Sequence, residues 1–152
     1  MVDLVQELTA LVQAFEQQGI PYALCGGIAL AVHGAPRATQ DIDLMARRED
    51  MDRIRVVAND CGFLFESLPM TFSSSGITIQ RFTKLIEQRP LMLDVLFAEG
   101  PLASVWETRS SFPWQGGSLQ VISREGPISL KLAAGRPQDI ADIQRLREVH
   151  RG

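Results

Sequence analysis

The sequence has few cysteines and no long apolar run. Cys25 and Cys61 are the only two cysteines among 152 residues. Two cysteines do not make a disulfide framework, so we expect free thiols in a reducing compartment. No apolar run approaches the ~20 residues of a membrane span. The first residues have neither the basic segment nor the continuous apolar segment of a signal peptide. We therefore expect a cytoplasmic protein with no membrane segment.

The sequence also lacks an excess of positive charge. It has 15 Lys and Arg against 18 Asp and Glu, for a net charge of −3. A general nucleic-acid binder carries a basic face, so we expect no broad nucleic-acid surface. A hydrophobic content of 45% and a charged content of 22% are typical of a soluble globular domain. The length corresponds to one domain, which leaves a two-substrate site to be completed by a partner or a twin subunit.

Apolar periodicity and turn residues predict an α/β (α+β) fold with a mixed β-sheet flanked by helices. The expected helices cover residues 3–18, 28–33, 49–59 and 101–107. The expected strands cover residues 22–25, 41–45, 63–65, 77–82, 91–97 and 119–122. Loops are expected at residues 69–76 and 112–118. We expect a single domain over 1–152, with a core at about 20–122 and C-terminal helices at about 124–149.

Three acidic residues stand in strand-like surroundings. Asp41 and Asp43 flank Ile42, so on a strand both carboxylates lie on one face, about 7 Å apart at Cα. Two such carboxylates repel each other unless a cation such as Mg²⁺ lies between them. The alternative is an exposed strand edge or a turn. Asp94 lies in the apolar run LMLDVLF, where it is either a third metal ligand, a base for a hydroxyl, or a salt-bridged or capping acid.

A glycine pair precedes these acids. Gly26-Gly27 follows a short apolar stretch and opens a predicted helix. Glycines there let a ligand approach the backbone, and the free N–H groups of a helix start attract phosphate. A tight turn is the alternative interpretation of the same pair.

Taken together, these elements resemble a known family. Gly26-Gly27, the run R-x-T-x-D-h-D at residues 37–43, and Asp94 in an apolar strand follow the order of the nucleotidyltransferase superfamily that includes DNA polymerase beta. The sequence is most similar to the small bacterial members: minimal nucleotidyltransferases, AbiEii-like toxin–antitoxin proteins and lincosamide-type enzymes. Residues 128–146 also resemble the helical segment that follows the core in AbiEii-like members. The resemblance covers most of residues 20–146.

The resemblance implies a reaction and a site. Asp41, Asp43 and Asp94 would hold Mg²⁺ (or Mn²⁺), and Gly26-Gly27 would hold the triphosphate of a nucleoside triphosphate. A nucleoside monophosphate would then move to a hydroxyl of a protein, an RNA or a small molecule, and pyrophosphate would leave. Asp94 would complete a second metal site or deprotonate the acceptor hydroxyl.

Three further residues are candidates for nucleotide binding. Arg37 and Thr39 belong to the motif, and Lys131 lies in an otherwise apolar helical stretch. Arg37 could instead pair with a carboxylate, and Lys131 could be solvated. The loop has Ile28 where many members have Ser or Thr, so backbone N–H groups alone would meet the phosphates.

The resemblance also suggests a toxin–antitoxin setting with a HEPN-like protein partner, or else a homodimer. Two alternatives to this enzyme are a non-catalytic antitoxin-like binding module of the same fold and a small antibiotic nucleotidyltransferase.

Overall fold

The computed structural model describes residues 3–32, 41–114 and 117–123. The helices expected at about 124–149 lie outside the described residues, as do Arg37, Thr39 and Lys131. No helix in the described ranges is long and apolar enough to cross a membrane.

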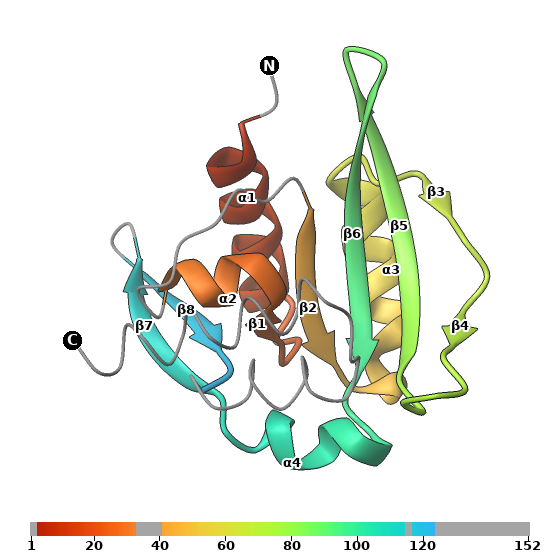
Figure 1. Cartoon of the computed structure of the whole chain (residues 1–152). Coiled ribbons are helices and arrows are strands. Elements are labelled where there is room, and N and C mark those ends of the chain that lie inside the picture. Colours follow the sequence, from red (N-terminus) through yellow and green to blue (C-terminus); the bar gives the residue numbers. More distant parts are fainter. Residues whose placement is uncertain (1–2, 33–40, 115–116, 124–152) are drawn as a thin grey trace.

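The described strands form one mixed eight-stranded sheet in the order β3-β5-β6-β2-β1-β8-β7, with β4 also paired to β5 (Figure 1). The strands are β1 (Ala23–Cys25), β2 (Ile42–Ala46), β3 (Phe65–Glu66), β4 (Met70–Thr71), β5 (Thr78–Ile86), β6 (Arg89–Phe97), β7 (Ser110–Trp114) and β8 (Gly117–Val121). The pairs β2–β6 and β1–β8 are parallel, and the other pairs are antiparallel. The mixed sheet predicted from the sequence is confirmed.

Helices cover the two faces of the sheet. The α-helices are α1 (Leu4–Gln17), α2 (Gly26–Val32), α3 (Met51–Asp60) and α4 (Ala103–Trp106), and the short 3₁₀ turns are η1 (Arg48–Asp50) and η2 (Gly100–Leu102). In Figure 1, α2 lies in front of the sheet and α3 lies behind β5 and β6. Helix α1 contacts α3 and buries an apolar stripe into the core, consisting of Leu8, Leu11, Val12 and Phe15.

The ends of α1 follow the sequence signals. Asp3 is its N-cap, and the Asp3 carboxylate accepts a hydrogen bond of 3.1 Å from the backbone N–H of Gln6. Gly19, with φ +65°, lies just beyond the helix in the left-handed conformation that ends many helices. Local chemistry therefore sets both boundaries of this helix.

The central strands β2 and β6 carry the core. Ile42 and Leu44 on β2, and Leu93 and Val95 on β6, are each at most 1% exposed. These apolar residues are next to the acids of the same strands, so core packing fixes the register in which the acids lie.

Three segments differ from the sequence expectation. Residues 69–76, expected as a loop, contain the two-residue strand β4, which pairs with β5. The predicted strands 77–82 and 91–97 are parts of one long hairpin, β5–β6, whose turn residues Glu87 and Gln88 have φ of 51° and 68°. These residues carry no glycine or asparagine signal, so the turn was not predicted. Residues 112–118, expected as a loop, supply parts of β7 and β8. Pro113 is accommodated because β7 is an edge strand.

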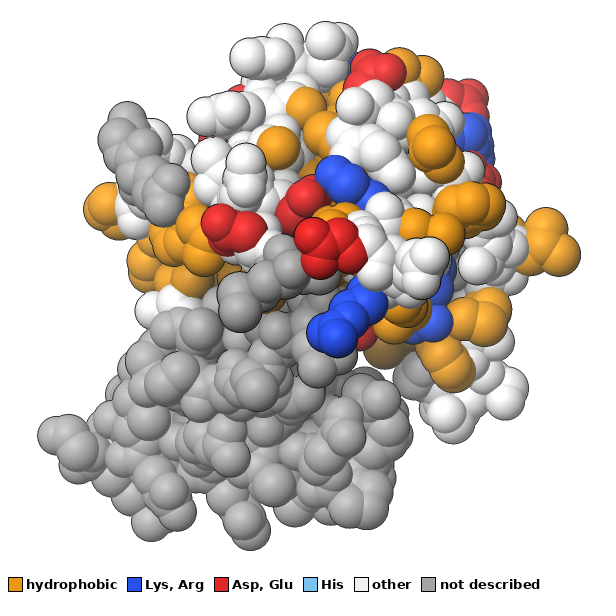
Figure 2. Space-filling model, turned by 90° about the horizontal axis from the view of Figure 1, so that it is seen from above, with side chains coloured by type: hydrophobic (Ala, Val, Ile, Leu, Met, Phe, Trp, Pro, Cys, Tyr) orange, Lys and Arg blue, Asp and Glu red, His pale blue; other side chains and the backbone are white. Residues whose placement is uncertain are grey.

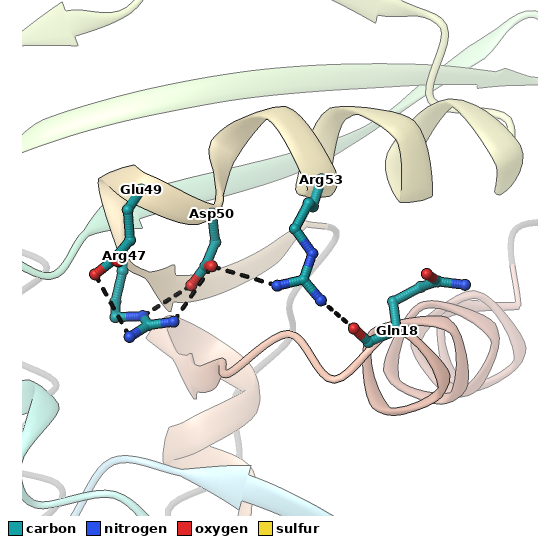
Figure 3. A network of polar contacts seen from close by, with 5 residues as sticks. All are labelled: Gln18, Arg47, Glu49, Asp50 and Arg53. Carbon is teal, nitrogen blue, oxygen red and sulfur yellow. Dashed lines mark hydrogen bonds and ion pairs between the residues drawn. The ribbon is translucent and has the colours of Figure 1, made fainter.

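A polar network braces the end of β2 opposite Asp41 and Asp43 (Figure 3). The Asp50 carboxylate, 5% exposed, accepts hydrogen bonds from Arg47 at 2.8 and 3.3 Å. Arg53 lies 3.6 Å from the same carboxylate and also donates to the backbone carbonyl of Gln18 at the end of α1. Asp50 thus ties β2, α3 and α1 together.

Hydrophobic side chains are exposed near β3 and β4. Figure 2 shows hydrophobic side chains along the rim of the molecule on the side where β3 and β4 lie. The exposed large hydrophobic residues of this segment are Leu64, Phe65, Leu68, Met70 and Phe72.

Candidate active site

The sheet register lines up a row of charged side chains across three neighbouring strands. Asp43 on β2 is the register partner of Asp94 on β6, and Asp94 is the partner of Arg81 on β5. On the other side of β2, Asp43 pairs with Cys25, the last residue of β1. Register partners on adjacent strands share a face, at a strand spacing of about 4.8 Å. The two predicted acids of different strands are therefore neighbours.

Asp41 joins this row from the residue just before β2. The pKa of Asp41 is raised, first by burial and then by the charge of Asp94. The charge of Arg81 and a hydrogen bond from the backbone of Met92 oppose that rise. The three acids expected from the sequence, Asp41, Asp43 and Asp94, thus gather where the start of β2 lies beside the middle of β6.

Asp94 is ion-paired. The Arg81 guanidinium donates from Nε to Asp94 Oδ1 at 2.8 Å and from Nη2 to Oδ2 at 3.0 Å, a two-pronged pair. The Asp94 side chain is 11% exposed and that of Arg81 is 36% exposed. One of the alternatives left open by the sequence, a salt-bridged Asp94, is what the structure contains. Such a pair still leaves acceptor positions on both carboxylate oxygens, because a carboxylate offers about four lone-pair sites.

Gly26 is fitted to Asp43. Its φ is +65°, and a Cβ built there would lie 2.3 Å from Asp43 Oδ2 and 2.9 Å from Asp43 Cγ. A distance of 2.3 Å is far inside van der Waals contact, so the Asp43 carboxylate occupies the space that any side chain at residue 26 would need. The glycine at the start of α2 therefore sets where this carboxylate lies.

The donor set suits a hard divalent cation in chemical type. Carboxylate oxygens are preferred ligands of Mg²⁺, which usually takes one or two carboxylates together with substrate phosphates. Among the described residues, no group of three or more His, Cys, Asp or Glu side chains is arranged to hold a metal ion. Asp41 and Asp43 thus fit as a carboxylate pair that shares a cation with phosphate oxygens, while Asp94 is engaged by Arg81.

A family comparison identifies the chain. Residues 9–151 match the family described as "Nucleotidyl transferase AbiEii toxin, Type IV TA system". The chain belongs to the AbiEii nucleotidyltransferase family. No curated protein sequence matches it significantly.

Solved structures show the same fold. TM1012 from Thermotoga maritima, described as a nucleotidyltransferase, aligns with a TM-score of 0.68 at 15% identity over 95% of this chain and 92% of that one. ANT(2")-Ia, solved with adenylyl-2"-tobramycin, aligns with a TM-score of 0.59 at 16% identity over 96% and 92%. JHP933 from Helicobacter pylori aligns with a TM-score of 0.61 at 16% identity over 94% and 64%. At such identities the likeness shows a shared fold.

In this AbiEii chain, one residue of the row was missed at the sequence level. Arg81 lies in the alternating stretch TIQRFTKLI, and nothing in that pattern marks it as a site residue. Its position follows from the β5–β6 hairpin: counting outward from the turn at Glu87 and Gln88 brings Arg81 opposite Asp94. Recognising the turn would have placed Arg81 opposite Asp94. The turn was missed because Glu87 and Gln88 are not residues typical of such turns.

Proposed function

We propose that this AbiEii-family chain is a metal-dependent nucleotidyltransferase whose site is built on Asp41, Asp43 and Asp94. The observation that carries the proposal is the convergence of these acids from two strands, with Gly26 shaped around Asp43. A structural ion pair would need only one acid beside Arg81. Three acids at one place, one of them with a raised pKa, carry an electrostatic cost that a cation offsets.

The residues divide the work as follows. Asp41 and Asp43 would hold Mg²⁺ or Mn²⁺ together with oxygens of the nucleoside triphosphate. When bound there, the cation would supply neutralisation of phosphate charge and alignment of the attacking and leaving oxygens. Asp94, next to Asp43 on β6, completes the ligand set or accepts the proton of the acceptor hydroxyl. The acceptor oxygen forms a bond to the α-phosphorus, the bond from that phosphorus to the bridging oxygen breaks, and pyrophosphate leaves.

The nucleotide would lie beside the start of α2. Gly26 and Gly27 would bring the backbone close to the triphosphate. Arg37, Thr39 and Lys131, which lie outside the described residues, complete the proposed nucleotide site. One domain over residues 1–152 carries all of these groups in the proposal.

The relatives support two candidate acceptors. The family is described as a toxin of a type IV toxin–antitoxin system, which supports a protein or RNA acceptor and a protein partner, either HEPN-like or a second copy of the chain. The structural likeness to ANT(2")-Ia, solved with an adenylylated tobramycin, supports a small-molecule hydroxyl as the second candidate acceptor.

Nucleotide binding with and without metal tests the proposal. We expect calorimetry to show binding of a nucleoside triphosphate in Mg²⁺ or Mn²⁺ and none in EDTA, and we expect Asp43→Asn to abolish it. Asp52→Asn is the matched control, because it also removes one carboxylate charge but from a side chain that is 99% exposed on α3. Equal binding with and without metal, or unaffected binding by the Asp43 variant, would refute the proposal.

Transfer is then tested with α-phosphate-labelled nucleotides. The protein is incubated with cell lysate or with an aminoglycoside, and the labelled product is identified. Label on a macromolecule supports the toxin setting, and label on the aminoglycoside supports the small-molecule acceptor. Metal-dependent binding with no labelled acceptor for any of the four nucleotides would instead identify a non-catalytic binding module.

A further inference from the structure

Arg81 is the one described cation of the polar row, and the roles assigned above do not use it. It comes from β5, the strand beyond Asp94, and its two-pronged pair fixes the plane of the Asp94 carboxylate. Its side chain is 36% exposed, so a ligand entering the row meets the guanidinium directly. Arg81 is therefore part of the environment that any cation at the acids experiences.

The guanidinium acts on all three acids. The pKa of Arg81 is raised by its hydrogen bonds to Asp94 and, against the opposing effect of burial, by the charges of Asp94, Asp41 and Asp43. Burial and the charge of Asp94 raise the pKa of Asp41, and the charge of Arg81 opposes that rise. A single Arg thus partly neutralises three carboxylates and holds that of Asp94 by two hydrogen bonds.

We propose that Arg81 is the internal counter-ion of the metal site: it orients Asp94 and partly neutralises Asp41 and Asp43 in the metal-free protein, and so weakens the binding of a divalent cation that arrives without nucleotide. This inference rests on the proposed function, since it concerns the same site. Arg81 is a positioning residue, because it acts through the three acids.

The counter-ion role has a functional consequence. A free divalent cation must bind beside a fixed positive charge and share Asp94 with it, which disfavours binding. A nucleoside triphosphate brings its own negative charge, so the cation and the nucleotide together overcome that repulsion. Arg81 therefore couples metal binding to nucleotide binding.

The test measures metal affinity in the absence of nucleotide. Mn²⁺ is titrated into wild-type protein, Arg81→Gln and Arg81→Lys, and free Mn²⁺ is followed by electron paramagnetic resonance. We expect Arg81→Gln to bind Mn²⁺ about tenfold more tightly than wild type, because a unit charge beside the cation is lost. We expect Arg81→Lys to remain close to wild type, because it keeps the charge. The melting temperature without metal falls in Arg81→Gln, and Mn²⁺ raises it by more than in wild type.

Arg48→Gln is the control. Arg48 makes a similar two-pronged pair with Glu99, at 3.0 and 2.5 Å, beyond the other end of β2. It should leave Mn²⁺ affinity unchanged. If Arg81→Gln lowers stability as Arg48→Gln does but binds Mn²⁺ no better than wild type, Arg81 is a structural ion pair and the inference is overturned. If Arg81→Gln does not fold, the affinity of the wild type decides. Tight Mn²⁺ binding by the wild type without nucleotide, with the same affinity in Arg81→Lys, would overturn the inference as well.

The outcomes separate this inference from the proposed function. Unchanged Mn²⁺ affinity in Arg81→Gln, with nucleotide binding that still needs metal and Asp43, refutes only the counter-ion role. Nucleotide binding that ignores metal refutes the proposed function. If neither wild type nor Arg81→Gln binds Mn²⁺ under any condition, both are wrong.

Discussion

Replacing Gly26 with alanine tests whether the glycine is there to make room for Asp43. An alanine at φ +65° pays the cost of the left-handed conformation, about 1–2 kcal/mol. Its Cβ would also lie 2.3 Å from Asp43 Oδ2 and 2.9 Å from Cβ and Cγ of the same side chain. Relieving that overlap moves the carboxylate or the start of α2, and overpacking of this kind costs about 1–3 kcal/mol. The expected total is about 2–5 kcal/mol.

Gly19 offers a control with the same backbone strain and no overlap. Its φ is also +65°, and the nearest atom to an added Cβ, Arg53 Nη2, is 4.0 Å away. Gly19→Ala should therefore cost only the conformational part, about 1–2 kcal/mol. The difference between the two variants isolates the overlap with Asp43.

Thermal and urea unfolding measure the difference. For a protein of this size, 1 kcal/mol corresponds to about 2–4 °C, so Gly26→Ala should melt ~2–12 °C below Gly19→Ala. Calorimetry with nucleotide and Mg²⁺ is the second measurement. We expect Gly26→Ala to lose affinity because Asp43 is displaced, and Gly19→Ala to bind like wild type. Equal destabilisation by both variants, with normal nucleotide binding in each, would refute the close fit of Gly26 to Asp43.

Two further predictions concern buried polar groups away from the site. Asp50→Asn should cost about 1–3 kcal/mol in urea unfolding, because it weakens the buried pair with Arg47, whereas exposed Asp52→Asn should change stability by less than about 0.5 kcal/mol. Tyr22→Phe should cost about 0.5–1.5 kcal/mol, because the buried hydroxyl accepts a 3.2 Å hydrogen bond from the Gln120 N–H. Burial raises the pKa of Tyr22 to about 12, so the tyrosine ionises at lower pH in the unfolded chain than in the folded protein. The stability of the wild type should therefore fall between pH 10 and 12, and that of Tyr22→Phe should not. An equal loss of stability in both proteins would contradict this prediction.

Local signals predicted the parts of the fold that depend on local chemistry. Helix α1 begins at the Asp3 cap and ends before Gly19 because those residues satisfy or redirect the backbone by themselves. The alternation around Asp43 predicted a strand with one polar face, and β2 is that strand. The neighbouring position of Asp94, by contrast, came from the family resemblance, because strand order is set by packing across the whole sheet.

Long-range pairing explains what the sequence did not predict. The β5–β6 hairpin turns through Glu87 and Gln88, residue types that rarely adopt positive φ, so its extent and its register were hidden. Arg81 was missed with them, since only the register brings it to Asp94. Strand β7 was read as a loop for a related reason: Pro113 usually argues against a strand, but an edge strand does not need its N–H.

The charge balance of the row argues that the site is built for more than stability. Asp41, Asp43 and Asp94 bring three negative charges when ionised, and Arg81, the cation of the described row, offsets one. The pKa of Asp41 is raised by burial and by Asp94, which means that its charged form is disfavoured in this fold. Each carboxylate that ionises here does so beside another, and an apolar or amide side chain would avoid that repulsion. In the proposed function, a divalent cation held by Asp41 and Asp43 would offset it, which gives these acids a purpose that packing alone does not.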